Sequence, residues 1–374
     1  MNILYCLSHI NKSLQWKWFA EELKVRGVKQ VYVLIDNDGG ETFFFKDLEA
    51  TGVEAHLLHH KGKMSYSKNI IRTRSLIRKH KIDIVHTSLP LGNMVGQTAA
   101  ILSGAGNRIT TCENVSWAHD FNNKKQKRID NFTFSQSRQI IATSEIAADY
   151  LRKNWQFDQS KLRTIYHGLK PSDYQVSPER VEAVRKKLKI DKQNEFVVGV
   201  VSRFEFWKGH EYIIEAANKL KDHPDIKFYI FGSKGSYFHE AEKRIEQYGL
   251  QQKVVYGGFV DDTSALYQLF DVHLHVPVNE HVETGGITIL EGMMAERPQV
   301  LTRSGYAWQT AKHLQNSYVV PFKNADSIAE AILWMKDNPD KANKLAAKAK
   351  EDSIAFSVQK KTDQHLALYN ELLK

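Results

Sequence analysis

Short apolar runs of four to seven residues, rich in Val and Ile, alternate with longer amphipathic stretches along most of the chain. This alternation is typical of parallel strands that are buried on both faces and connected by helices. In the first half, the runs predict strands at residues 3–7, 31–35, 55–58, 82–86, 108–111, 139–143 and 162–165. Between the first two runs, Leu14, Trp18 and Leu23 recur at helical spacing, which predicts a helix ending near Gly27.

A second set of apolar runs begins at residue 196, after a polar stretch. It predicts strands at 196–201, 227–231, 254–256, 272–276, 299–301 and 318–320, and helices at 210–220, 238–248, 263–270, 287–295 and 325–338. We therefore expect an α/β protein with two Rossmann-like doubly wound domains, because one hydrophobic core rarely serves so long a chain. Their expected bounds are 1–170 and 191–355, with a linker at 171–190 and a final helix at 356–374.

Composition fits a globular protein, with 42% apolar and 25% charged residues. The opening stretch lacks a cationic segment followed by a long apolar one, and no later apolar run approaches the ~18 residues of a spanning helix. We therefore expect a cytoplasmic protein. Cys6 and Cys112 are the only cysteines, so neither a disulfide framework nor a zinc site is predicted, and both are expected to be reduced and structural.

Positive charge is concentrated in the first half of the chain. Residues 1–170 carry 25 Lys and Arg against 15 Asp and Glu, whereas residues 171–374 carry 27 against 28. Residues 61–81 contain eight cations and no acid, and a second basic run spans 124–128. These runs suit a phosphorylated acceptor, an anionic membrane surface or nucleic acid, and they equally suit a solvated helix face.

Candidate binding residues follow the first strand of the second domain. Arg203 and Lys208 lie in the loop between that strand and the next helix, and Gly209 comes directly before the helix. Two cations beside a helix N-terminus, whose free N–H groups favour anions, can hold a diphosphate without a metal. The same two residues could instead be exposed loop cations.

A second candidate segment runs from Glu283 to Glu291. Gly285 and Gly286 precede a helix that is predicted to begin at Ile287, so backbone N–H groups there can approach a ligand. One carboxylate lies in the loop and the other about one turn into the helix, and carboxylates accept hydrogen bonds from sugar and ribose hydroxyls. Their spacing alone would also fit a charge at the helix start and a surface residue.

Taken in order, these motifs resemble the second domain of the family 4 retaining glycosyltransferases. The resemblance in the second half is carried by Arg203-(x)4-Lys208-Gly209, Phe231-Gly232, Val254-(x)2-Gly257, Glu283-(x)7-Glu291 and Pro298. The first half resembles the family more loosely, through residues 83–86, 140–145 and 165–169. The resemblance implies the GT-B fold, in which two Rossmann-like domains face each other and a C-terminal helix crosses back to the first.

The resemblance also implies roles for individual residues. Arg203 and Lys208 would neutralise the donor diphosphate. Glu283 and the backbone of Gly285, Gly286 and Ile287 would hold the donor sugar, and Glu291 would bind the ribose.

The implied reaction moves a hexose or N-acetylhexosamine, with retention, from a nucleoside-diphosphate sugar to a glycan, lipid-linked or phosphorylated acceptor. Synthesis of a cell-surface polysaccharide or glycoconjugate would use such a step. No cofactor and no metal are expected, since two cations and a helix terminus can stabilise the leaving diphosphate. His273, His275 and His281 are the alternative that would favour a metal cluster.

Departures from the family pattern fall on the acceptor side. Residues 8–12 replace the usual glycine-rich turn, and Glu296 stands where glycine usually precedes the proline. Many members place a histidine after the strand at 108–111, where this chain has Glu113, and the nearest histidine is His119. His119 could donate a hydrogen bond to a sugar hydroxyl, and Glu113 occupies the matching position, so both are candidate catalytic neighbours.

Two other functions fit parts of the sequence. A nucleotide-sugar epimerase of similar architecture would bind the same diphosphate without an acceptor. A nucleic-acid-binding protein would use the basic run at 61–81, but that run has few interleaved aromatic residues and no known recognition module, so nucleic acid is not expected as a partner. The basic first domain instead favours peripheral contact with an anionic membrane or a phosphorylated acceptor.

Overall fold

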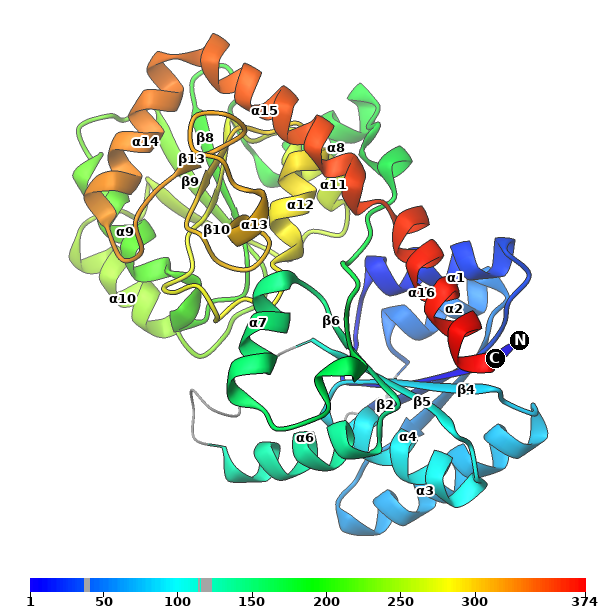
Figure 1. The fold of residues 1–374 in the computed structure, drawn as a ribbon. Helices are drawn as coiled ribbons and strands as arrows, with labels where there is room; N and C mark the ends of the chain where they lie inside the picture. The colour runs from blue at the N-terminus through cyan, green and yellow to red at the C-terminus, as the bar shows by residue number, and fades with distance from the viewer. Residues whose placement is uncertain (37–40, 114, 116–122) are drawn as a thin grey trace. The chain divides into compact units, whose positions relative to one another are not determined.

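The computed structural model describes residues 1–36, 41–113, 115 and 123–374. These residues form two compact units, one of Met1–Leu169 with Phe356–Lys374 and one of Lys170–Ala355 (Figure 1). Each unit has its own parallel sheet with helices on both faces, as the alternation of apolar runs predicts.

The first unit contains a seven-stranded sheet in the order β3-β2-β1-β4-β5-β6-β7. Its strands and helices are β1 (Asn2–Ser8), α1 (Leu14–Val25), β2 (Lys29–Asp36), α2 (Phe43–Thr51), β3 (Glu54–His59), α3 (Lys63–Lys79), β4 (Ile84–Ser88), α4 (Pro90–Ser103), β5 (Asn107–Cys112), α6 (Lys124–Gln136), β6 (Gln139–Ala142), α7 (Glu145–Asn154), β7 (Leu162–Thr164) and α16 (Val358–Leu373). All seven expected strands are present. Helices α3, α4 and α6 lie on one face, and α1, α2 and α16 on the other (Figure 1).

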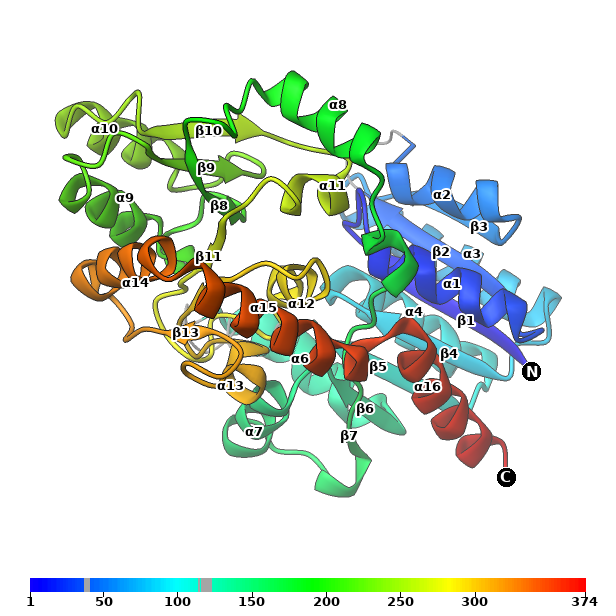
Figure 2. The same ribbon diagram turned by 90° about the horizontal axis from the view of Figure 1, so that it is seen from above.

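Helix α16 packs within the first unit although it ends the chain. It lies beside α1 in both views (Figures 1 and 2). The buried hydroxyl of Tyr369 is 3.1 Å from that of Tyr5 on β1 and 2.7 Å from Nδ1 of His86 on β4. These hydrogen bonds satisfy buried polar groups and fix the helix on the sheet.

The second unit contains a six-stranded sheet in the order β10-β9-β8-β11-β12-β13. Its elements are η2 (Pro171–Tyr174), α8 (Pro178–Leu188), β8 (Phe196–Val201), η3 (Phe206–Lys208), α9 (His210–Lys219), β9 (Ile226–Phe231), α10 (Phe238–Gln247), β10 (Val254–Gly258), α11 (Thr263–Tyr267), β11 (Val272–His275), α12 (Ile287–Met294), β12 (Gln299–Leu301), α13 (Ala307–Thr310), β13 (Tyr318–Val319), α14 (Ala325–Asp337) and α15 (Pro339–Ser353). The short turn η4 (Ile354–Phe356) leads to α16. All six expected strands are again present.

The stretch expected as a linker, residues 171–190, is ordered structure of the second unit. It forms η2 and α8, and α8 begins with Ser177 as a capping residue and Pro178 in its first turn. This stretch is polar because α8 buries only Val184. A helix with so narrow an apolar stripe lacks the periodicity that identifies helices in sequence.

Two departures from the family pattern occupy left-handed backbone. His9 has a φ of 55° in the turn after β1, and Glu296 has a φ of 57° after α12. Glycine adopts this conformation without strain, which explains why the family pattern has glycine at both places. The Glu296 carboxylate accepts a hydrogen bond from Lys350 of α15 at 2.7 Å, a contact that glycine could not make.

Both cysteines are free and buried, as expected. No helix in the described part of the chain has the length and apolarity to cross a bilayer.

Candidate active site

The candidate donor site lies in the second unit, where the sheet changes direction. Strand β8 pairs with β9 on one side and β11 on the other, so the chain winds outward in both directions from this point. Doubly wound sheets bind ligands at such a switch point, outside the carboxyl ends of the strands. The loop after β8 carries Arg203 and Lys208, and the loop after β11 carries Glu283.

Backbone contacts hold these two loops together. The N–H of Val278 donates to the carbonyl of Trp207 at 3.0 Å. Gly209 has a φ of 79°, and a Cβ there would lie 2.0 Å from the carbonyl oxygen of Val276. Only glycine fits this position, which explains why the chain places it directly after Lys208.

Lys208 and Glu283 form an ion pair between Nζ and Oε1, across 75 positions of sequence. Their side chains are only 16% and 10% exposed. The two residues predicted to serve the diphosphate and the sugar therefore lie together. The ammonium has three N–H donors, so Lys208 can hold Glu283 and still offer donors to an anionic ligand.

Arg203 is exposed at the end of β8, and its backbone is anchored by His210. Nε2 of His210 is 2.9 Å from the Arg203 carbonyl, and the ring stacks on Phe204 with centroids 4.4 Å apart. Burial lowers the pKa of His210 to about 4, so the ring is neutral at pH 7 and its Nε2–H can donate to the carbonyl. This histidine supports the loop, and nothing in its sequence spacing signalled that role.

The glycines before α12 are fixed by neighbouring backbone. The carbonyl of Gly285 accepts a hydrogen bond of 2.6 Å from Tyr306 N, and a Cβ on Gly305 would lie 2.4 Å from the same oxygen. Gly286 is the N-cap residue of α12, with a φ of 70°. The first turn beginning at Ile287 thus starts beside Glu283, where unpaired N–H groups favour an anion or a polar hydroxyl.

His275 ends β11 beneath these glycines. Its Nδ1 is 3.2 Å from Thr288 Oγ1, and a Cβ on Gly286 would lie 3.3 Å from its Nε2. Burial, helped by Lys208 and His210, holds the pKa of His275 well below its usual range, so the ring is neutral. Its alternation with His273 in the strand was the only sequence signal, and it belonged to the alternative of a metal cluster.

That cluster does not form among the described residues. His273 points into the core, where its Nδ1 is 3.1 Å from Nε2 of Gln299, and its ring centroid is 6.3 Å from that of His275. His281 lies in the loop and pairs with Glu280 at 2.9 Å.

Glu291 is buried on α12, which excludes the alternative of a surface residue. Its Oε2 accepts a hydrogen bond of 3.1 Å from the hydroxyl of Tyr267. Burial raises the pKa of Glu291 to about 7, although hydrogen bonds from Tyr267 and Tyr174 act in the opposite direction. Glu291 therefore changes charge near neutral pH, a property that sequence spacing could not indicate.

The acceptor-side candidates lie in the first unit. His119 is outside the described residues. Glu113, directly after β5, is partly buried, with 16% of its side chain exposed, and pairs with Nε2 of His167 at 3.1 Å. Burial alone would raise the pKa of Glu113, but His167, Lys361 and a hydrogen bond from Ser88 outweigh it, so the pKa is lowered.

Lys361, on α16, adds a positive charge beside Glu113 and His167. It is buried over the rings of Trp16 and Phe19, and burial lowers its pKa to about 8. The space lined by Glu113, His167 and Lys361 is about 10 Å³, close to the minimum for a single water. Glu113 thus belongs to a compact and largely buried network that no sequence pattern signals.

Comparisons with known proteins agree with the division into two units. The family description "Glycosyl transferases group 1" matches residues 181–352, and "Glycosyltransferase Family 4" matches residues 19–173. An uncharacterized glycosyltransferase of Methanocaldococcus jannaschii is 32% identical over 200 residues, which are 53% of this chain and only 50% of the relative's length.

Two further relatives cover more of the chain. A UDP-Gal:alpha-D-GlcNAc-diphosphoundecaprenol alpha-1,3-galactosyltransferase of Escherichia coli is 22% identical over 317 residues, or 82% of this chain and 80% of the relative. The crystal structure of Anabaena Alr3699/HepE in complex with UDP and glucose covers 99% of both chains, with a TM-score of 0.85 and 19% identity.

The structural likeness shows that the fold is GT-B, with Rossmann-like units. The two family descriptions together match most of both units, and "Glycosyl transferases group 1" spans every donor-site candidate from Arg203 to Glu291. The chain belongs to the family 4 glycosyltransferases.

Proposed function

We propose that this glycosyltransferase moves a hexose or N-acetylhexosamine from a nucleoside-diphosphate sugar, with retention and without a metal. The acceptor is a glycan, lipid-linked or phosphorylated molecule, and the product belongs to a cell-surface polysaccharide or glycoconjugate made at the cytoplasmic side of the membrane. The observation that carries the proposal is the Lys208–Glu283 pair beside the first turn of α12.

The donor fits this site through charge and hydrogen bonding. Arg203 and Lys208 hold the diphosphate, together with N–H groups at the start of α12. Glu283 accepts hydrogen bonds from sugar hydroxyls and Glu291 from the ribose. The Anabaena relative was solved with UDP and glucose, and the Escherichia coli relative is named for UDP-Gal, which makes UDP-sugars the first donors to test.

In the proposed reaction, the bond between the anomeric carbon and the diphosphate oxygen breaks. The negative charge that develops on the diphosphate is stabilised by the two cations and the helix terminus. The acceptor hydroxyl attacks the face that the diphosphate leaves, and its proton passes to the departing phosphate oxygen. The anomeric configuration is therefore retained.

The donor is tested by thermal shift with UDP-, GDP- and ADP-sugars, where a bound donor raises the melting temperature. NMR of the product then reports the anomeric configuration, and inversion would exclude the mechanism. Transfer should persist in EDTA, and its loss would contradict metal independence. Incubation with the donor alone distinguishes an epimerase, which would produce a new epimer without any acceptor.

We also propose that the outer face of α3 contacts an anionic membrane. Met64 and Ile71 on this helix are 90% and 65% exposed, and the exposed cations Lys68 and Arg72 lie between and beside them. Apolar side chains surrounded by cations suit an interface of anionic head groups and acyl chains. An acceptor that is linked to a lipid would be presented at that surface, as with the diphosphoundecaprenol in the name of the Escherichia coli relative.

Sedimentation with liposomes tests this contact. Lys68→Glu should weaken binding to anionic liposomes by about 2 kcal/mol, since each cation near such a surface contributes about 1 kcal/mol and the substitution reverses one. Lys243→Glu, on an exposed position of α10 in the second unit, is the matched control and should leave binding unchanged. Sedimentation that does not depend on anionic lipid would refute the proposal.

A further inference from the structure

Three metal-ligand side chains meet at one edge of the first unit, away from the carboxyl ends of its strands. Glu54 and His56 occupy alternate positions at the start of the edge strand β3, so their side chains leave the same face of the strand. His80 follows the last turn of α3. One carboxylate oxygen and two imidazole nitrogens of these residues lie within 4.8 Å of one another, the one such trio among the described residues.

Contacts within the trio centre on a single oxygen. Oε1 of Glu54 is 2.9 Å from Nε2 of His56 and 3.1 Å from Nε2 of His80. Nε2 of His80 is itself buried and makes no hydrogen bond to any described residue, despite its short distance to the carboxylate. Its lone pair or N–H is therefore not aligned with that oxygen, and the nitrogen can serve another partner.

We propose that Glu54, His56 and His80 bind a zinc ion. Two imidazole nitrogens and one carboxylate oxygen are a recurrent zinc donor set, with bonds of about 2.0–2.2 Å that leave tetrahedral ligand atoms roughly 3.3 Å apart. Both nitrogen–oxygen distances are already within about half an ångström of that spacing, so small side-chain rotations admit the ion. The imidazole pair favours zinc over magnesium or calcium, which prefer oxygen ligands.

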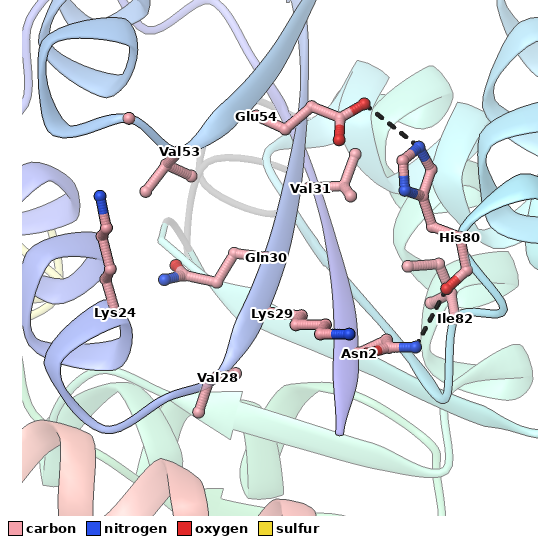
Figure 3. Close-up of a pocket in the computed structure, with 11 residues that line it drawn as sticks. Asn2, Lys24, Val28, Lys29, Gln30, Val31, Val53, Glu54, His80 and Ile82 are labelled. Atoms are coloured by element: carbon pink, nitrogen blue, oxygen red, sulfur yellow. Dashed lines mark hydrogen bonds and ion pairs between the residues drawn. The ribbon is translucent and has the colours of Figure 1, made fainter.

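Surrounding groups prepare the site for a cation. The Asn2 side chain donates to the carbonyl of His80 at 3.0 Å, which fixes the backbone that carries one ligand (Figure 3). Lys79 is 4.0 Å from Glu54 Oε1 on a largely exposed side chain, which can turn to solvent when the ion enters.

The proposed site borders an open surface pocket. Figure 3 shows Glu54 and His80 at one side of this pocket, with Lys24 and Lys29 among the other lining residues. Its volume is about 330 Å³, which leaves ample space for water on the ion. A zinc ion here would tie the start of edge strand β3 to the end of α3, and would stabilise this corner of the first unit.

The experiment uses the full-length protein, freed of any affinity tag and dialysed against chelator. Zinc is titrated against a competing chromophoric chelator, and cobalt is added separately because tetrahedral cobalt has intense visible bands. Wild-type protein should bind one equivalent of zinc and melt at a higher temperature with it. His56→Ala and His80→Ala should each weaken zinc binding at least tenfold and abolish the cobalt bands, and excess magnesium should not compete.

His239→Ala is the matched control, because His239 pairs with Glu242 at 3.2 Å on α10 but belongs to no such trio among the described residues. It should bind zinc as the wild type does. Glu54→Gln, which keeps the side-chain shape, provides a further variant, and circular dichroism in chelator checks that every variant is folded. The proposal would be overturned if His56→Ala and His80→Ala bound zinc as tightly as the wild type does. It would also be overturned if the wild type bound no zinc.

Discussion

The Lys208–Glu283 pair makes a prediction that separates folding from donor binding. Replacing Lys208 by Met removes the ammonium and leaves the Glu283 carboxylate with only a tenth of its side chain exposed. Removing one partner of a buried ion pair costs about 3–5 kcal/mol, because the remaining charge keeps its desolvation penalty. The single variant should therefore lose about 3 kcal/mol or more in free energy of unfolding.

The double variant Lys208→Met with Glu283→Gln removes both charges. A buried pair replaced by neutral groups of similar size is often close to neutral in stability, so the double variant should recover most of the loss. The coupling energy from the double-mutant cycle should exceed about 2 kcal/mol. Urea unfolding, followed by fluorescence and circular dichroism on all four proteins, measures it.

Donor binding should not recover with stability. The double variant lacks both the ammonium that holds the diphosphate and the carboxylate that accepts sugar hydroxyls, so it should show neither a thermal shift with donor nor transfer. Lys208→Met as stable as the wild type would refute the buried ion pair. A stable double variant with full activity would instead refute the donor site.

Other predictions concern Glu291, Gly209 and Arg203. Burial raises the pKa of Glu291 from 4.5 to about 7, so the stability that its protonated form contributes is complete below about pH 4.5 and is lost as the pH rises through 7, by about 3 kcal/mol. Unfolding at pH 5 and at pH 8 should show most of this loss, and Glu291→Gln should lack it. Gly209→Ala should lower the free energy of unfolding by at least about 2 kcal/mol, because its Cβ would meet Val276. Gly249→Ala has open space at a similar φ and should lower it by about 1 kcal/mol, and thermal melting of both variants checks the difference. Arg203→Ala should change the free energy of unfolding by less than about 0.5 kcal/mol, because Arg203 is exposed. The same variant should bind the donor roughly 10- to 100-fold more weakly in a calorimetric titration, and unchanged affinity would exclude a contact between Arg203 and the diphosphate.

Sequence alone predicted the strands of both sheets and about half of the helices that the structure describes. Runs such as 196–201 are apolar throughout because a parallel strand is covered on both faces, so the pattern is visible without any knowledge of neighbours. The position of a loop after such a strand then follows, which is why Arg203, Lys208 and Glu283 could be assigned to the carboxyl ends of strands. The hydrophobic pattern does not predict helix α8, because this helix buries a single side chain.

Tertiary structure alone decided the properties of the site. Lys208 and Glu283 pair because β8 and β11 are neighbours in the sheet, and no local pattern records which strands lie side by side. Glu291 has a raised pKa because the folded chain buries its carboxyl group. In the same way, the trio of Glu54, His56 and His80 forms only where β3 meets the end of α3. Hydrophobic periodicity is local, whereas charge pairing, desolvation and ligand geometry depend on distances through space that only the folded chain sets.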